Sequence, residues 1–207
     1  MNAYEILCED KVAAVVRAPS VADPAGLADA LAGSGVRLVE FTFTIPGAVN
    51  VIRAASDSNS ATVGAGTVMT ADQARAALDA GARFLVSPAL RPEIAEVGAA
   101  ARVPVFLGAF TPTEIADAVD IGAAAVKLFP ARVGGPDYLR DLRGPFPDVA
   151  LLPSGGVGED NVGEWLEAGA PAVFAGSSMV PSEAVARGDH DEIVRRAKSF
   201  VARVGRS

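Results

Sequence analysis

Short apolar segments alternate with longer alanine-rich segments along almost the whole chain. The apolar segments contain Val, Leu and Phe with few charges, which is typical of parallel strands covered on both faces. They predict strands at residues 12–16, 38–43, 62–64, 84–86, 103–107, 124–129, 149–152 and 172–175. The alanine-rich segments have helical spacing, for example at residues 25–32, 71–80, 92–101, 113–121 and 161–168. This alternation predicts a parallel sheet built from strand–helix units.

Glycine and proline mark the expected boundaries of these helices. Four helices end where a glycine could take the left-handed conformation before the next strand, at Gly35, Gly81, Gly122 and Gly169. Two segments, 111–114 and 87–92, supply a capping residue and a proline for a helix start. Further helices are expected near residues 3–9 and 191–204.

Eight strand–helix units in 207 residues predict an α/β fold of the (β/α)₈ TIM barrel type. We expect a single domain over residues 1–207, with a short N-terminal helix, because no linker or low-complexity segment divides the chain. An open doubly wound sheet is the alternative. It is less favoured, because Arg17-Ala18-Pro19-Ser20 follows the first strand where a glycine-rich dinucleotide motif would stand.

Composition excludes several classes of function. The net charge of −7 gives no reason to expect nucleic acid or an anionic membrane surface as a partner. No apolar run reaches the about 18 residues that span a bilayer, and the acidic N-terminal segment does not look like a secretory signal, so we expect a cytoplasmic protein. One cysteine, Cys8, and one histidine, His190, leave no cysteine-based metal site and no Ser/His/Asp triad. Neither a metal nor a cofactor is expected.

Lys127 stands alone in the apolar segment 124–130. The chain has 15 arginines but three lysines, and Lys11 and Lys198 lie in polar neighbourhoods. A lysine in a covered strand either extends its amine to the surface, pairs with a carboxylate, or has a lowered pKa. Lowering that pKa by about three units makes the amine roughly one-third neutral at pH 7, at a cost of about 4 kcal/mol. A neutral amine is what a Schiff-base enzyme needs.

Glu40 is the one charge in the segment 38–44, where apolar residues alternate with threonines. It could form a buried ion pair with Lys127 or Arg17 for structural reasons alone. It could instead be a general acid/base whose pKa the surroundings raise. Spacing leaves both interpretations open, but a lone lysine and a lone glutamate inside barrel strands favour the catalytic one.

The C-terminal ends of the strands carry the other candidates, because active sites of this fold lie there. The polar residues at these positions are Arg17, Glu40, Thr42, Thr44, Thr67, Ser87, Lys127, Ser154 and Ser177. Two glycine-rich loops, 154–156 and 176–177, follow predicted strands seven and eight, where barrels often bind phosphate. These glycines could also serve tight turns alone. Arg17 follows the first strand, beside the eighth in a closed barrel. We expect Arg17 to reach an anion at these loops, although a surface ion pair is the alternative.

Seven segments occur in the order found in the KDPG/KHG aldolase family, which the chain resembles from about residue 12 to residue 204. They are 39–42 (VEFT), 64–68 (GAGTV), 86–88 (VSP), 111–114 (TPTE), 126–130 (VKLFP), 153–157 (PSGGV) and 176–177 (GS). Members of this family are class I aldolases that act on 2-keto-3-deoxy-6-phosphogluconate (KDPG) and 4-hydroxy-2-oxoglutarate (KHG). The resemblance implies a (β/α)₈ barrel, a homotrimer, and no metal.

By this resemblance Lys127 is the Schiff-base lysine and Glu40 is the general acid/base. Thr67 is implied at the carboxylate of the pyruvyl group, and Phe129 as a wall of the pocket. Gly155, Gly156 and Ser177 match the phosphate-binding loops. Substrate-binding roles are further implied for Arg17, Thr44, Pro88, Ser154 and Gly176.

Three departures from the family pattern concern the substrate. Thr44 stands where many members have arginine, Ser154 stands where threonine is usual, and Leu107-Gly108 replaces a Pro-Gly after strand five. These changes leave the reaction class in place and leave open which 2-keto acid is preferred.

The implied reaction is a retro-aldol cleavage of a small, phosphorylated 2-keto-4-hydroxy acid. The products would be pyruvate and an aldehyde, either glyceraldehyde 3-phosphate or glyoxylate. Two other functions fit the same barrel. One is a phosphosugar isomerase or epimerase with Glu40 as base and Lys127 as a fixed charge. The other is a non-catalytic protein that binds a phosphorylated ligand.

Overall fold

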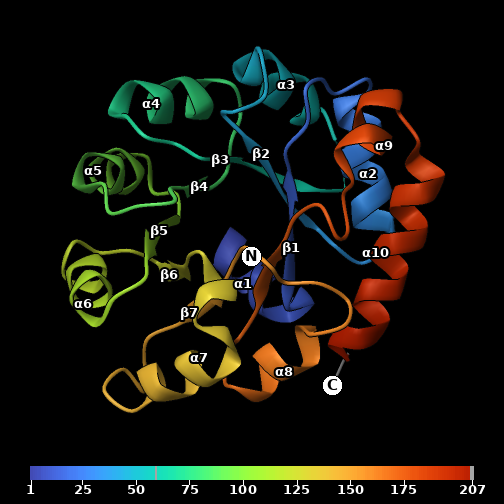
Figure 1. The fold of residues 1–207 in the computed structure, drawn as a ribbon. Helices are drawn as coiled ribbons and strands as arrows, with labels where there is room; N and C mark the ends of the chain where they lie inside the picture. Colours follow the sequence, from blue (N-terminus) through green and yellow to red (C-terminus); the bar gives the residue numbers. More distant parts are fainter. Residues whose placement is uncertain (59, 206–207) are drawn as a thin grey trace.

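Eight parallel strands form a ring with helices on its outside (Figure 1). The structure is a computed structural model, and it describes residues 1–58 and 60–205. The strands are β1 (Val12–Val16), β2 (Leu38–Thr42), β3 (Thr62–Gly66), β4 (Leu85–Val86), β5 (Val105–Ala109), β6 (Ala125–Leu128), β7 (Leu151–Pro153) and β8 (Val173–Ala175). Their order is β7-β6-β5-β4-β3-β2-β1-β8, and an isolated parallel bridge between Ser154 and Phe174 brings the two edges together. The predicted (β/α)₈ barrel is confirmed.

Helices surround this ring and alternate with its strands. They are α1 (Ala3–Asp10), α2 (Pro24–Gly33), α3 (Ala48–Ala55), α4 (Ala71–Asp79), α5 (Pro92–Ala101), α6 (Pro112–Asp120), α7 (Gly135–Arg143), α8 (Val162–Glu167), α9 (Ser182–Arg187) and α10 (His190–Val204), with a 3₁₀ turn, η1 (Ala131–Val133). Among the residues described, no helix is both long enough and apolar enough to cross a membrane.

Helix boundaries follow the sequence signals in most places. Gly35, Gly81, Gly122 and Gly169 all have positive φ angles, as expected after a helix. Thr111 and Glu114 form a capping box at the start of α6. The expectation that segment 87–92 supplies a capping side chain is wrong, because the residue before α5 is Arg91 and its side chain makes no capping hydrogen bond. Pro92 does take the first position of α5.

Two strands begin later than predicted, because their first apolar residues belong to turns. Val103 donates its backbone N–H to Gly98 of α5, so β5 begins at Val105. Val149 likewise donates to Phe146, and β7 begins at Leu151. As a result Gly108, which the sequence placed after strand five, lies within β5.

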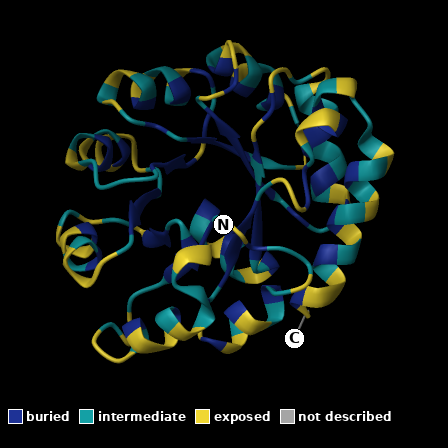
Figure 2. Cartoon of the chain, in the orientation of Figure 1, coloured by how far each residue is buried: buried dark blue, intermediate teal, exposed yellow. Residues whose placement is uncertain are grey.

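Apolar side chains fill the inside of the barrel, so the ring is a packed core rather than a pore. Figure 2 shows the buried strands in the centre and the exposed residues on the outer faces of the helices. Phe84, Phe106 and Phe174 lie in the interior, and helix α1 adds Ala3 and Leu7 to the same cluster. Helix α1 therefore covers the end of the barrel at which the strands begin.

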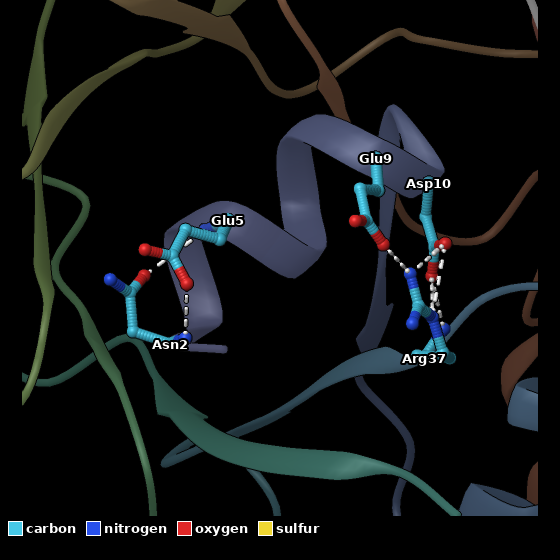
Figure 3. Close-up of polar contacts among 5 residues, drawn as sticks. All are labelled: Asn2, Glu5, Glu9, Asp10 and Arg37. Carbon is cyan, nitrogen blue, oxygen red and sulfur yellow. Dashed lines mark hydrogen bonds and ion pairs between the residues drawn. The ribbon is translucent and has the colours of Figure 1, made fainter.

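An ion-pair network holds the end of α1 against the start of β2 (Figure 3). The guanidinium of Arg37 donates to Glu9 and to both oxygens of Asp10, and the backbone N–H of Arg37 donates to Asp10 as well. Asn2 and Glu5 form a capping box at the other end of α1. The helix is thus fixed at both ends.

Candidate active site

A cavity of about 930 Å³ opens at the end of the barrel where the strands finish. Every candidate binding residue from the sequence lines it, together with the candidate lysine: Arg17, Thr44, Thr67, Pro88, Lys127, Phe129, Ser154, Gly155, Gly156, Gly176 and Ser177. Glu40 is fully buried and lies beside Lys127. Thr42 and Ser87, two further residues at strand ends, are also buried and are not lining residues of the cavity.

Lys127 and Glu40 meet inside the barrel from different strands. Lys127 is in β6 and Glu40 in β2, and the Lys127 Nζ lies 3.5 Å from the Glu40 Oε2. Their exposed fractions are 5% and 0%. Neither carboxylate oxygen of Glu40 accepts a well-aligned hydrogen bond from any described residue. The two groups therefore have each other as ionic partners and little else.

Burial dominates the titration of both groups. Loss of water raises the pKa of Glu40, and the attraction to Lys127 opposes that change without cancelling it. Loss of water likewise lowers the pKa of Lys127, against the attraction to Glu40. The positive charge of Arg17 lowers the pKa of both groups. Burial therefore favours the neutral form of each group, and the attraction between the two groups opposes it.

Gly66 of β3 provides the space that Glu40 occupies. A methyl group at position 66 would overlap the Glu40 Oε1 atom and the carbons next to it. Gly66 pairs with Thr42 of β2, and the side chain of Glu40 reaches across to it. A larger residue at position 66 would therefore displace the carboxylate. The glycine-rich character of this strand is thus a requirement of the site.

Threonine hydroxyl groups and the guanidinium of Arg17 lie at the strand ends near the ion pair. Thr42 Oγ1 donates to the Val16 carbonyl and lies 2.8 Å from Thr44 Oγ1. Arg17 Nη2 donates to Thr67 Oγ1 over 3.3 Å. Thr67 has a φ of 54°, a conformation that is rare for a β-branched residue. This strained residue turns the chain at the end of β3, where its hydroxyl meets Arg17.

The loop after β7 is held against the loop after β6. Ala131 N–H donates to the Ser154 carbonyl and Arg132 N–H to the Gly155 carbonyl. A side chain at Gly156 would overlap the Cβ of Arg132, and Gly156 has a φ of 91°. The two glycines therefore allow the loops to approach closely and leave backbone exposed to the cavity.

The sequence analysis missed several lining residues. Arg132 lines the cavity from η1 and its guanidinium pairs with no described residue, while Asp160 supplies the one acidic side chain of the lining. Phe174 lines the bottom, and the Lys127 Nζ lies 4.9 Å from the centre of its ring. A signal for Arg132 was present, since it is a charge three residues after Phe129. The contact of Phe174 depends on closure of the ring and has no local signal.

The match of the chain to known proteins extends over almost its whole length. Residues 4–196 match the family model described as KDPG and KHG aldolase. The chain belongs to this aldolase family.

Several named relatives of this family are similar from end to end. The KHG/KDPG aldolase of Escherichia coli K12 is 33% identical over 202 residues, which cover 97% of this chain and 95% of the relative. The 2-dehydro-3-deoxy-phosphogluconate aldolase of Pseudomonas aeruginosa is 34% identical over 202 residues, or 96% and 92% of the two chains. These relatives are carbon–carbon lyases, so the comparison favours aldolase activity over the isomerase, epimerase and binding-protein alternatives.

Solved structures of KDPG aldolases have the same fold. The Legionella pneumophila enzyme, which was captured with pyruvate as a covalent carbinolamine intermediate, superposes with a TM-score of 0.87. It is 29% identical, and the match covers 94% of this chain and 96% of that one. The Zymomonas mobilis enzyme gives a TM-score of 0.88 at 27% identity, with 98% and 97% coverage. The aldolase family thus accounts for both the sequence and the barrel.

Proposed function

We propose that Lys127 and Glu40 cleave a 2-keto-4-hydroxy acid of the KDPG type into pyruvate and an aldehyde, by class I aldolase chemistry. The observation that carries this proposal is the buried pair itself, with the Lys127 amine 3.5 Å from the Glu40 carboxylate at the bottom of a cavity. The cavity supplies polar groups at both ends of such a substrate.

The first half of the reaction forms the covalent intermediate. The neutral Lys127 amine attacks the C2 ketone, and a proton moves from nitrogen to oxygen to give a carbinolamine. Glu40 in its protonated form gives a proton to the departing hydroxyl, so that water leaves and an iminium cation remains. Glu40 is then an anion beside this cation. The lowered pKa of Lys127 and the raised pKa of Glu40 suit both roles.

The second half breaks the carbon–carbon bond. Glu40 removes the proton of the C4 hydroxyl, through a water molecule or directly. The electrons of the C3–C4 bond move into the iminium, which becomes an enamine, and the aldehyde leaves. Protonation at C3 and attack of water on the resulting iminium release pyruvate and restore the Lys127 amine.

The two ends of the substrate would bind at different parts of the cavity. Arg17 and Thr67 lie together and near the ion pair, so we assign the carboxylate of the keto acid to them. The sequence alone favoured the phosphate end for Arg17, and its hydrogen bond to Thr67 is what changes our interpretation. Backbone groups of Gly155, Gly156 and Gly176, with the hydroxyl groups of Ser154 and Ser177, would receive the phosphate. Pro88, Phe129 and Thr44 would form walls.

The assembly and location of the chain are also part of this proposal. Family membership supports a homotrimer and a cytoplasmic location. Size-exclusion chromatography with light scattering would test the trimer.

Trapping with borohydride tests the proposed chemistry. Reduction in the presence of pyruvate should add one pyruvate-derived mass to Lys127, found by peptide mapping. The Lys127→Gln variant should not be labelled, whereas Lys198→Gln, which changes an exposed lysine outside the cavity, should be labelled like the wild type. An isomerase, an epimerase or a binding protein would gain no such mass. Labelling at Lys11 or Lys198 would reject Lys127 as the nucleophile.

A further inference from the structure

We propose that Phe174 is a positioning residue for the reacting nitrogen, because the face of its ring stabilises the positive charge that the Lys127 nitrogen carries as an ammonium or an iminium. This inference rests on the aldolase function proposed above and names a group that this function does not yet include. The aromatic ring of Phe129, at the wall of the pocket, is farther from the nitrogen.

The position of the Phe174 ring is well defined. Phe174 lies in β8, is 1% exposed and lines the bottom of the cavity. The Lys127 Nζ lies over its ring at 4.9 Å from the centre, within the range of a cation–π interaction. The corresponding distance to the Phe129 ring is 5.9 Å. Phe174 is therefore the closer of the two aromatic contacts.

Neighbouring aromatic rings fix this orientation. The ring of Phe106 packs edge-on against Phe174, with ring centres 5.9 Å apart and an interplanar angle of 66°. Phe84 also packs against Phe106, with ring centres 5.9 Å apart. The Phe174 ring is thus held in place by the barrel core and cannot turn away without disturbing it.

The charges around Lys127 show why a neutral ring matters here. Glu40 is the acidic group next to the nitrogen, Arg17 is a cation near both groups, and Arg132 and Asp160 line the cavity. While Glu40 holds a proton, the ammonium form of Lys127 has no adjacent anion among the described residues. The iminium has the Glu40 carboxylate beside it, but this carboxylate takes up and gives away protons during each turnover. The electron-rich face of Phe174 does not titrate, so it stabilises the cation at every stage.

Weakening this ring should lower two measurable quantities, the pKa of Lys127 and the affinity for pyruvate. The ammonium form of Lys127 would become less stable, so the pKa of the amine would fall. The iminium with pyruvate would also become less stable, so pyruvate would bind more weakly at a pH where the amine is already neutral. A packing defect alone would not make the pKa of Lys127 and the affinity for pyruvate both fall in step with the electron density of the ring.

The test replaces Phe174 with mono-, di- and trifluorophenylalanine in the full-length enzyme. Fluorine withdraws electrons from the ring face and changes its size little. The pKa of Lys127 is measured from the pH dependence of its labelling by an amine reagent, followed by peptide mapping. We expect this pKa to fall stepwise by about one unit in total, and the affinity for pyruvate on the high-pH plateau to fall up to about tenfold. The same series at Phe84, which does not contact Lys127, is the control and should leave both quantities unchanged.

The possible outcomes separate this inference from the proposed function. If pyruvate is trapped at Lys127 but neither the pKa nor the affinity follows fluorination, the role of Phe174 is overturned and the aldolase assignment stands. If pyruvate is not trapped at all, the aldolase assignment fails, and the labelling titration still reports whether the ring stabilises the ammonium. Equal shifts for the Phe84 and Phe174 series would assign the effect to packing and overturn the proposal.

Discussion

Two ionisable side chains share one space from which water is excluded, and each sets the behaviour of the other. Burial moves the pKa of Lys127 down and the pKa of Glu40 up, so the two values approach each other. A proton can then pass between amine, carboxyl group and substrate without a large change in free energy. At this scale the site is one acid–base unit rather than two separate residues.

Replacing Glu40 by Gln should lower kcat by about 10²–10⁴-fold, the usual effect of losing a general acid/base. The amide keeps the shape of the carboxyl group, so the fold should be retained, as measured by circular dichroism. Removing the carboxylate also removes an attraction that raises the pKa of Lys127, so this pKa should fall further.

Glu96→Gln provides the matched control for this variant. Glu96 is an exposed residue of α5 outside the cavity, so its replacement should not change kcat. Wild-type turnover in a well-folded Glu40→Gln enzyme would show that Glu40 is only a structural partner of Lys127.

Replacing Arg132 by Ala should raise KM for a phosphorylated substrate by about tenfold or more, because a hydrogen bond to a charged group contributes about 1.5–3 kcal/mol. Its guanidinium pairs with no described residue, and its side chain begins beside Gly156 in the loop that we assign to phosphate. An unphosphorylated 2-keto acid should be cleaved as before. Steady-state kinetics on both substrates measures the difference.

Arg17 and Arg140 give the comparison variants for Arg132. Arg17→Ala should weaken both substrates, since both carry the carboxylate that we assign to Arg17. Arg140→Ala, in α7, changes an exposed arginine that pairs with Asp137 and should weaken neither. Equal losses on both substrates in Arg132→Ala would remove Arg132 from the phosphate end.

The strand β3 contributes to the site through Gly66, whose lack of a side chain leaves room for the Glu40 carboxylate of β2. Gly66→Ala should therefore reduce kcat strongly and lower the melting temperature, because the added methyl group overlaps Glu40. Gly33→Ala, near the end of α2, meets no atom within 4 Å and is the control for adding a methyl group to a glycine. Normal activity in Gly66→Ala would show that the carboxylate can move without consequence.

The helix α1 depends on Arg37 for its attachment to the barrel. Arg37→Ala would leave the Asp10 carboxylate, with 6% of its side chain exposed, without its cation. Arg37 is itself partly exposed, so we expect a loss of about 2 kcal/mol, between the values for surface and buried pairs. For a chain of this size that corresponds to a fall in Tm of about 4–8 °C, measurable by thermal unfolding. An unchanged Tm would mean that apolar packing of Ala3 and Leu7 alone holds α1.

At the scale of the whole molecule, the alternation of apolar and alanine-rich segments was sufficient to predict the barrel. The lone Lys127 and lone Glu40 stood out in the sequence, because a charge inside a covered strand has few structural uses. The structure brings the two groups together inside the barrel, and their catalytic roles stay a prediction. The late starts of β5 and β7 were missed, since Val103 and Val149 bond back to the preceding turns. The place of Phe174 could not be predicted, because its contact with Lys127 depends on closure of the ring of strands. Arg132 did leave a signal, a charge three residues after Phe129, that the sequence analysis did not use.

Helix α1 covers one end of the barrel, so molecules reach Lys127 from the other end, and this has a consequence for the order of events in time. In the proposed reaction the pyruvyl fragment stays bonded to the Lys127 nitrogen at the bottom of the cavity, while the aldehyde lies between that fragment and solvent. The aldehyde must depart first, and water can attack the remaining iminium only afterwards. Pyruvate should then inhibit cleavage competitively, because it binds the same free enzyme as the substrate. The aldehyde should inhibit noncompetitively, because it binds the enzyme that still carries the pyruvyl fragment. Closure of one end of the barrel by α1 thus fixes the order of product release, with the aldehyde first and pyruvate second.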